Sequence, residues 1–171
     1  MTPPQSTPQL SPEQLAKRKA ALASPMTVKV IKYMAKAQVR LFTLTGGRIG
    51  SKWRIGAGFR KPVPTLLLDH VGRKSGTRFR TPLLYLLDGP DVVVVASQGG
   101  LPKNPQWYPN LVASPDTTIQ IRTEKRAVRA RTASPEERKA LWPRLVELYA
   151  DFEVYQQCTD REIPVVVLEP R

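Results

Sequence analysis

The chain has 171 residues, about the length of one domain, and 41% of them are hydrophobic, which is enough for a modest core and excludes a wholly disordered protein. No apolar run approaches the roughly 20 residues that a membrane-spanning helix needs, and the N-terminus lacks the pattern of a secretory signal, so we expect a cytoplasmic protein. The single cysteine, Cys158, and the single histidine, His70, exclude an internal disulfide and argue against a metal site. We therefore expect no metal, and a structural role for His70 at a strand end.

The formal net charge of +13 is concentrated near the N-terminus. Residues 1–61 contain 12 Lys or Arg and a single acid, Glu13, a net of +11, whereas residues 62–171 contain 15 Lys or Arg and 13 acids, a net of +2. The larger part of the chain therefore has the balanced charge of an ordinary domain, and the basic character belongs to an extension. Because no groove-reading or RNA-stacking motif accompanies this charge, we expect no nucleic-acid partner.

The extension begins with a tail and a helix. Residues 1–10 are rich in Pro, Thr, Ser and Gln and are expected to be disordered. The sequence SPEQ at 11–14 combines a capping serine, a proline at the first helical position and a glutamine three residues after the cap, which predicts a helix as far as about Ala23. Residues 11–61 are thus predicted to form a basic helical extension that ends in a glycine-rich loop.

A second helix of the extension is predicted from the Ser-Pro pair at 24–25 to Leu44, where two glycines end it. Its apolar residues at helical spacing are Val30, Ile31, Met34, Leu41 and Phe42. A basic stripe is formed by Lys29, Lys32, Lys36 and Arg40. Two interpretations stay open: the helix packs on the domain with its basic face in water, or it lies on an anionic membrane surface or covers a lipid-like substrate. The second would make the protein peripheral on the inner face of the cell membrane.

Residues 62–171 are predicted to form mainly β structure with helices, in the α+β class. Strands are expected at 65–70, 83–87, 91–97, 117–123, 126–132 and 163–168. A short helix is expected at 105–112, and the capping sequence SPEE at 134–137 predicts another that runs to about Tyr149. Because most strands follow one another in hairpins with few helical crossovers, the pattern favours an antiparallel barrel over a doubly wound sheet.

A cationic, glycine-bounded turn joins the first two predicted strands. Its sequence is GRKSGTRFR, residues 72–80, and Arg73, Lys74 and Ser75 supply two charges and a hydroxyl that suit an anion such as phosphate. The glycine spacing is neither that of a Walker loop nor that of a dinucleotide-binding fingerprint. A basic hairpin turn exposed to water is the alternative.

A second stretch that invites a functional interpretation is ASQGGLPKNPQWYPN, residues 96–110. Its adjacent glycines would let the backbone approach a ligand closely, and Pro105 starts a helical turn with free N–H groups. The alternative is a capped turn followed by aromatic core residues.

Together these stretches resemble the deazaflavin-dependent nitroreductase and quinone reductase family. The resemblance rests on GRKSG, TPLLYL, ASQGG, KNPQWYPN and TDREIPVVVLEP, which occur in order between Leu66 and Pro170. It implies a split antiparallel β-barrel of the FMN-binding split-barrel type over residues 62–171, as in actinobacterial reductases of this family. It also implies an enzyme that uses coenzyme F420, a deazaflavin, to transfer hydride to a quinone or nitro-aromatic acceptor.

The resemblance also implies roles for individual residues. Those expected to contact the cofactor are Arg73, Lys74, Ser75, Gly76, Arg80, Pro82, Ala96, Ser97, Gln98, Gln106 and Asn110. Among them, Arg73 to Gly76 match the segment that grips the phosphate and acidic tail, and Pro82 lies beside the ring. Phe79 stands where relatives often have arginine, so Arg80 or Arg78 is expected to supply that contact.

Hydride transfer requires placement and a dry cleft more than reactive side chains. Trp53 and Phe59, in the glycine-rich loop, are expected to cover the cleft. The negative charge that the acceptor gains needs a donor, and Ser97, Tyr149 and Tyr155 are the candidate catalytic residues.

Other interpretations remain open. One is a non-enzymatic protein that binds a deazaflavin, flavin or lipid on the same barrel, and another is an FMN-dependent oxidase. The oligomeric state is expected to be a monomer or a homodimer.

Overall fold

The computed structural model describes residues 11–53 and 61–171. The predicted tail, the side chain of Trp53 and the whole of Phe59 lie outside the described residues. The elements in chain order are α1 (Pro12–Ala23), α2 (Pro25–Leu44), β1 (Lys52–Trp53), β2 (Val63–Val71), β3 (Arg78–Asp88), β4 (Asp91–Val95), the 3-10 turn η2 (Gln98–Gly100), α3 (Trp107–Ala113), β5 (Asp116–Ile121), β6 (Glu124–Thr132), α4 (Pro135–Leu148), α5 (Asp151–Gln157) and β7 (Val165–Pro170).

Strands β2 to β7 form a closed antiparallel barrel, which confirms the predicted split-barrel fold. The order in the sheet is β1-β2-β3-β4-β7-β6-β5, and pairing of β2 with β5 closes it. All six strands expected from the sequence are present. The β5–β6 hairpin turns two residues earlier than expected, at Arg122 and Thr123, because Ile121 already pairs with Glu124.

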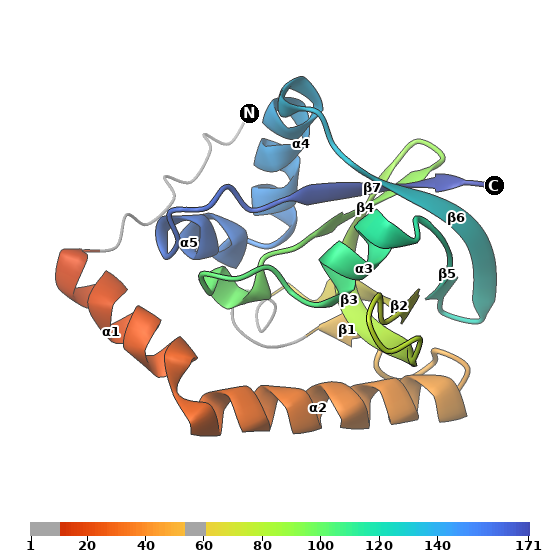
Figure 1. Cartoon of the computed structure of the whole chain (residues 1–171), viewed down its shortest axis with the longest axis horizontal. Helices are drawn as coiled ribbons and strands as arrows, with labels where there is room; N and C mark the ends of the chain where they lie inside the picture. The colour runs from red at the N-terminus through yellow and green to blue at the C-terminus, as the bar shows by residue number, and fades with distance from the viewer. Residues whose placement is uncertain (1–10, 54–60) are drawn as a thin grey trace.

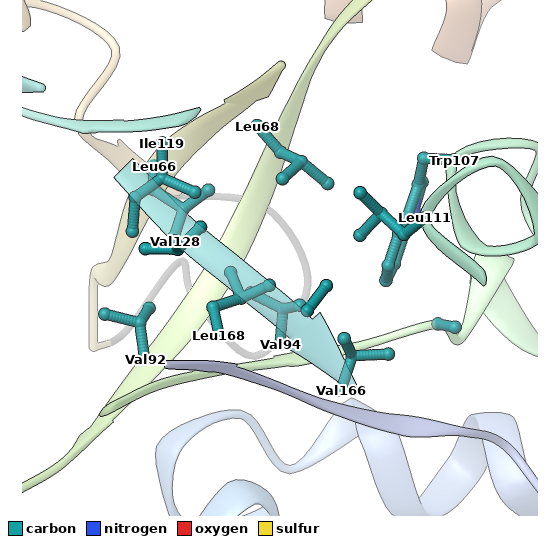
Figure 2. Close-up of a cluster of buried hydrophobic side chains, with 12 residues drawn as sticks. Leu66, Leu68, Val92, Val94, Trp107, Leu111, Ile119, Val128, Val166 and Leu168 are labelled. Atoms are coloured by element: carbon teal, nitrogen blue, oxygen red, sulfur yellow. The ribbon is translucent and has the colours of Figure 1, made fainter. Parts of the chain in front are cut away.

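The barrel interior is filled by aliphatic side chains that alternate along the strands. Figure 2 shows these side chains together with Trp107 and Leu111, which α3 contributes to the same cluster. The residues labelled there are Leu66, Leu68, Val92, Val94, Trp107, Leu111, Ile119, Val128, Val166 and Leu168. Trp107 is only 4% exposed, so this aromatic residue belongs to the core.

A second core lies outside the barrel, under α4 and α5. Val93 and Val95 of β4 and Val165 and Val167 of β7 turn their side chains to this cluster, whereas their neighbours point into the barrel. Both faces of β4 and β7 are therefore buried, which explains why these strands are nearly continuous valine runs. Helix α5 was not predicted, because neither a capping side chain nor a proline marks its start.

Helices α1 and α2 form a bent arm outside the barrel (Figure 1). Phe42 anchors α2 with a fully buried side chain, and Gln38 Nε2 donates to the carbonyl of Gly50 over 2.9 Å. The predicted apolar face is partly wrong: Met34 and Leu41 are 45% and 46% exposed. The helix packs through the side that carries Phe42. The side chains of Val30 and Ile31, which were expected on the same face, lie outside those that the structure describes.

Candidate functional site

The cationic turn between β2 and β3 uses its own backbone groups to close. The N–H of Gly72 donates to the carbonyl of Thr77, and the N–H of Gly76 donates to the carbonyl of Gly72, each over 2.8 Å. The Thr77 N–H donates to the Ser75 hydroxyl. These N–H groups are therefore committed within the turn, and the exposed side chains of Arg73, Lys74 and Ser75 remain to meet an anion.

Asn110 of α3 connects the turn to this helix through hydrogen bonds of its side-chain amide. Its side-chain carbonyl accepts from the Arg73 N–H over 3.1 Å, and its Nδ2 lies 3.0 Å from His70 Nδ1. Because Nδ2 can only donate, Nδ1 is an acceptor and the proton sits on Nε2, which lies 3.0 Å from Thr81 Oγ1. Both ends of the Asn110 amide are thus used inside the protein, so this residue holds the turn in place.

His70 has the structural role that its position suggested. It is 7% exposed, and its ring stacks on Phe79 with the centroids 5.5 Å apart. Burial lowers the pKa of His70 below 6.5, and the nearby Asp69 offsets part of that effect. The neutral imidazole is the form that the hydrogen bond from Asn110 requires.

Arg80 is held by a partner of its own. Its Nε and one terminal nitrogen donate to the two carboxylate oxygens of Asp69 over 2.6 and 3.2 Å, and its other terminal nitrogen reaches Thr43 of α2. The ion pair with Asp69 raises the pKa of Arg80. The side chain links β2, β3 and α2.

The barrel opens where β3 and β4 stop pairing. Their register runs only from Tyr85 with Val94 to Asp88 with Asp91, whereas β3 pairs with β2 up to Arg78. Residues 78–84 of β3 therefore have a hydrogen-bonded neighbour on one side only. Pro82 lies in this segment, opposite Leu67, where a missing N–H does not interrupt a central ladder.

The chain leaves β4 next to this open edge, at Ala96 and Ser97. Ala96 is fully buried and donates its N–H to the carbonyl of Pro164, while Ser97 is half-buried and Gln98 exposed. The second of the two glycines that follow, Gly100, packs closely against α5. A Cβ there would lie 2.6 Å from the carbonyl oxygen of Tyr155, so this glycine allows close packing on α5.

Arg161, which the sequence interpretation did not single out, organises the same segment. Its guanidinium donates to the carbonyls of Ala96, Ser97 and Leu101 and to Asn104 Oδ1, at distances of 2.8–3.3 Å. The TDREIP motif that contains it was visible in the sequence. Its target lies about 60 residues earlier in the chain, however, and no local pattern predicts that contact.

An aromatic cluster formed by Tyr149, Phe152 and Tyr155 lies at the α4–α5 junction. The ring centroids are 5.2–6.5 Å apart, and the two tyrosine hydroxyls are 3.4 Å from each other. Tyr149 is 4% exposed and belongs to the outer core, whereas Tyr155 is half-buried. Tyr155 is also linked to the β4 end, because its backbone packs on Gly100.

A hollow of about 600 Å³ lies between the cationic turn and α3. It is lined by Arg73, Asn104, Tyr108, Pro109, Val112 and Ala113. Gln106 is exposed at the start of α3. The described residues contain no group of three or more His, Cys, Asp or Glu that could hold a metal ion, and no helix among them is long and apolar enough to cross a membrane.

Comparisons with known proteins agree with this architecture. A Mycobacterium tuberculosis protein, Rv3178, whose name places it among F420H(2)-dependent quinone reductases, is 59% identical over 118 residues, which are 69% of this chain and 99% of the relative. The F420H(2)-dependent quinone reductase Rv1261c of the same organism is 38% identical over 125 residues, 71% of this chain and 84% of the relative.

Solved structures of similar proteins also superimpose on this chain. An F420-H2-dependent reductase (FDR-A) superimposes with a TM-score of 0.58 at 37% identity, over 62% of this chain and 94% of the other. A structure described as a domain-swapped dimer matches with the same TM-score and identity, over 80% of its own chain. The family model of F420H(2)-dependent quinone reductases matches residues 27–170, and with the barrel, its open edge and these relatives it shows that the chain belongs to that family.

Proposed function

We propose that this protein binds the reduced form of coenzyme F420 and transfers hydride from it to a quinone or a nitro-aromatic compound. The observation that carries the proposal is the placement of an exposed cationic turn beside the open edge of the barrel, in a chain of the F420H(2)-dependent quinone reductase family. A cofactor with a planar ring and an acidic tail needs both features at once.

The residues present fit such a cofactor. Arg73 and Lys74, with the Ser75 hydroxyl and Gly76, offer cationic and hydrogen-bonding groups to a phosphate and a polyglutamate tail. The hollow beside Arg73 gives that tail a place to lie. We assign the ring to the open edge, next to Pro82 on β3 and to Ala96, Ser97 and Gln98 at the end of β4.

Two predicted contacts act differently from the others in this proposal. Asn110 supports the turn from inside, and Arg80 supports the strands through Asp69. Gln106, exposed at the start of α3, is assigned to a direct contact near the tail.

The bound cofactor would supply the hydride, and the chain's own residues would place the acceptor and stabilise the charge that it gains. Ser97 lies at the β4 end with a half-buried side chain, where its hydroxyl can donate to the acceptor. Tyr155, beside it through Gly100, is the second donor, and Tyr149 orients Tyr155 through the hydroxyl pair. Gly100 keeps this junction compact.

Ligand titrations test the proposal directly. Oxidised and reduced F420, FMN and FAD are titrated separately into the protein, and oxidation of the reduced deazaflavin is followed with menadione as acceptor. Binding of F420 with steady-state menadione reduction supports the proposal. Binding without turnover would make the protein a carrier, and tight co-purifying FMN would make it an FMN-dependent oxidase.

Replacing Lys74 by alanine should weaken F420 binding about fivefold, since an exposed charge contributes about 1 kcal/mol to such a contact. The loss should shrink at high salt, because exposed charges are screened. Lys125→Ala, at the far end of the β5–β6 hairpin, removes the same charge elsewhere and should leave the affinity unchanged. If Lys74→Ala and Lys125→Ala bind F420 with equal affinity, the turn does not contribute to the cofactor site.

We further propose that α2 brings the protein to anionic membranes, in keeping with a membrane-dissolved quinone as acceptor. Met26, Tyr33 and Leu44, spaced to share one side of the helix, are 76%, 69% and 85% exposed. Exposed basic residues flank them at Lys29, Lys36 and Arg40. Apolar side chains with cationic neighbours are typical of a helix that lies in a membrane interface.

Sedimentation with vesicles tests this attachment. Vesicles that contain phosphatidylserine should carry the protein down at low salt, and vesicles of phosphatidylcholine should not. Substitution of Tyr33 and Leu44 by serine should abolish the binding without changing menadione reduction in solution.

As to assembly, the relative described as a domain-swapped dimer favours the homodimer over the monomer.

A further inference from the structure

We propose that Arg161 is a positioning residue of the cofactor site: by holding the carbonyls of Ala96 and Ser97, it turns the N–H groups of Ser97 and Gln98 toward the open edge of the barrel, where they can donate to an acceptor-rich ring edge. The inference rests on the proposed binding of F420 and assigns to this site a residue that touches neither cofactor nor acceptor.

One guanidinium gathers four oxygens from a single segment. Arg161 donates to Ser97 O over 2.9 Å, Ala96 O over 3.3 Å, Leu101 O over 3.0 Å and Asn104 Oδ1 over 2.8 Å. The segment from the end of β4 to the approach of α3 is therefore bent around one side chain. A guanidinium has five N–H donors on three nitrogens and can reach four separated acceptors at once, whereas a lysine has three donors on a single nitrogen.

The direction of the N–H groups follows from the planarity of the peptide bond. In a trans peptide the carbonyl of one residue and the N–H of the next point in opposite directions. Because the Ala96 and Ser97 carbonyls point to Arg161, the N–H groups of Ser97 and Gln98 point away from it. No backbone acceptor for either group is found among the described residues.

The backbone conformation of this segment indicates that it is held under constraint. Gln98 has φ of 47°, in the left-handed region that residues other than glycine seldom adopt, and Gly99 and Gly100 follow at 67° and 80°. Such a conformation is strained in a residue with a side chain and persists where surrounding contacts impose it. The bonds from Arg161 on both sides of Gln98 are contacts of that kind.

Arg161 is itself fixed from α5. Gln156 Nε2 donates to the Arg161 carbonyl over 2.9 Å, so the aromatic helix and the β4 end are joined through this residue. The four acceptors of Arg161 are all neutral groups, so they do not cancel the charge of its guanidinium. Its positive charge therefore remains available behind the β4 end, where it favours an electron-rich ring edge on the other side.

Arg161→Ala and Arg161→Lys, compared with the full-length wild type, test the proposal. With F420H2 and menadione, Arg161→Ala should lower kcat/KM about 100-fold, the scale of loss when reacting groups are misplaced by about 1 Å. The same variant should bind F420 more weakly than the wild type, and millimolar guanidinium chloride should restore part of that lost affinity. Arg161→Lys keeps the charge but serves fewer carbonyls, so it should lie between the alanine variant and the wild type.

Arg131→Ala is the matched control, because Arg131 also joins distant segments, by pairing with Glu137 and Glu169 away from the β4 end. Arg131→Ala should lower Tm, but adding guanidinium chloride should not raise the affinity of this variant for F420. Wild-type affinity and kcat/KM in Arg161→Lys would overturn the inference, even if Arg161→Ala fails to fold. A wild type that does not bind F420 would instead overturn the proposed function.

Discussion

Replacing Trp107 by alanine should lower the free energy of unfolding by about 3–5 kcal/mol, the cost of emptying a large aromatic site in a core. The indole closes the barrel cluster from α3 and is 4% exposed (Figure 2). For a domain of this size the loss corresponds to a fall in Tm of about 6–20 °C. Thermal unfolding followed by far-UV circular dichroism measures it.

The same substitution should reach the cofactor site through α3. Asn110 is one helical turn after Trp107 and supports the Arg73 N–H, so a displaced α3 should also weaken F420 binding. Trp142→Ala is the matched control, because Trp142 is half-buried on α4 and hydrogen-bonds to Glu153. It should cost less stability and leave F420 affinity unchanged. Similar losses of affinity in both variants would contradict the role assigned to α3.

Replacing Gly100 by alanine should destabilise the protein by about 2–5 kcal/mol, from a left-handed backbone and from overpacking. Its φ is 80°, and the added Cβ would lie 2.6 Å from the carbonyl oxygen of Tyr155 and 2.8 Å from the Cβ of Cys158. Helix α5 would have to move away from η2. Since Tyr155 belongs to α5, menadione turnover should fall together with Tm.

Gly89→Ala separates the two causes of that loss. Gly89 has φ of 60°, but no heavy atom lies within 4 Å of its added Cβ, so only the backbone cost of about 1–2 kcal/mol applies. Urea unfolding of both variants gives the comparison. Equal losses at the two positions would mean that the contact between Gly100 and α5 is not tight in solution.

Local chemistry in the sequence was enough to predict most of the fold. The capping boxes that begin at Ser11 and Ser134 are both present, and each helix begins at the proline that follows the capping serine. The strands appear at the expected positions because their alternation and apolar runs depend on neighbours in the chain. The cationic turn of residues 72–76 was visible for the same reason, since its glycines and charges are contiguous.

Only the tertiary structure decided which partners these residues meet. Arg80 pairs with Asp69, Asn110 joins His70 to Arg73, and Arg161 gathers the carbonyls that follow β4. The first of these contacts lies within the β2–β3 hairpin, where Asp69 stands opposite Arg80. The other two join segments that only the packing of the whole domain brings together.

The surface of α2 gives the same lesson. The spacing of its residues predicted one apolar and one basic face. Which apolar side chains are buried depends on where α2 packs against the barrel, and this buries Phe42 but leaves Met34 and Leu41 exposed. The local sequence thus determined the elements and the charges that they carry. The packing of helices and strands in the whole domain determined which of those groups support one another and which face water, because most of those contacts join residues far apart in the chain.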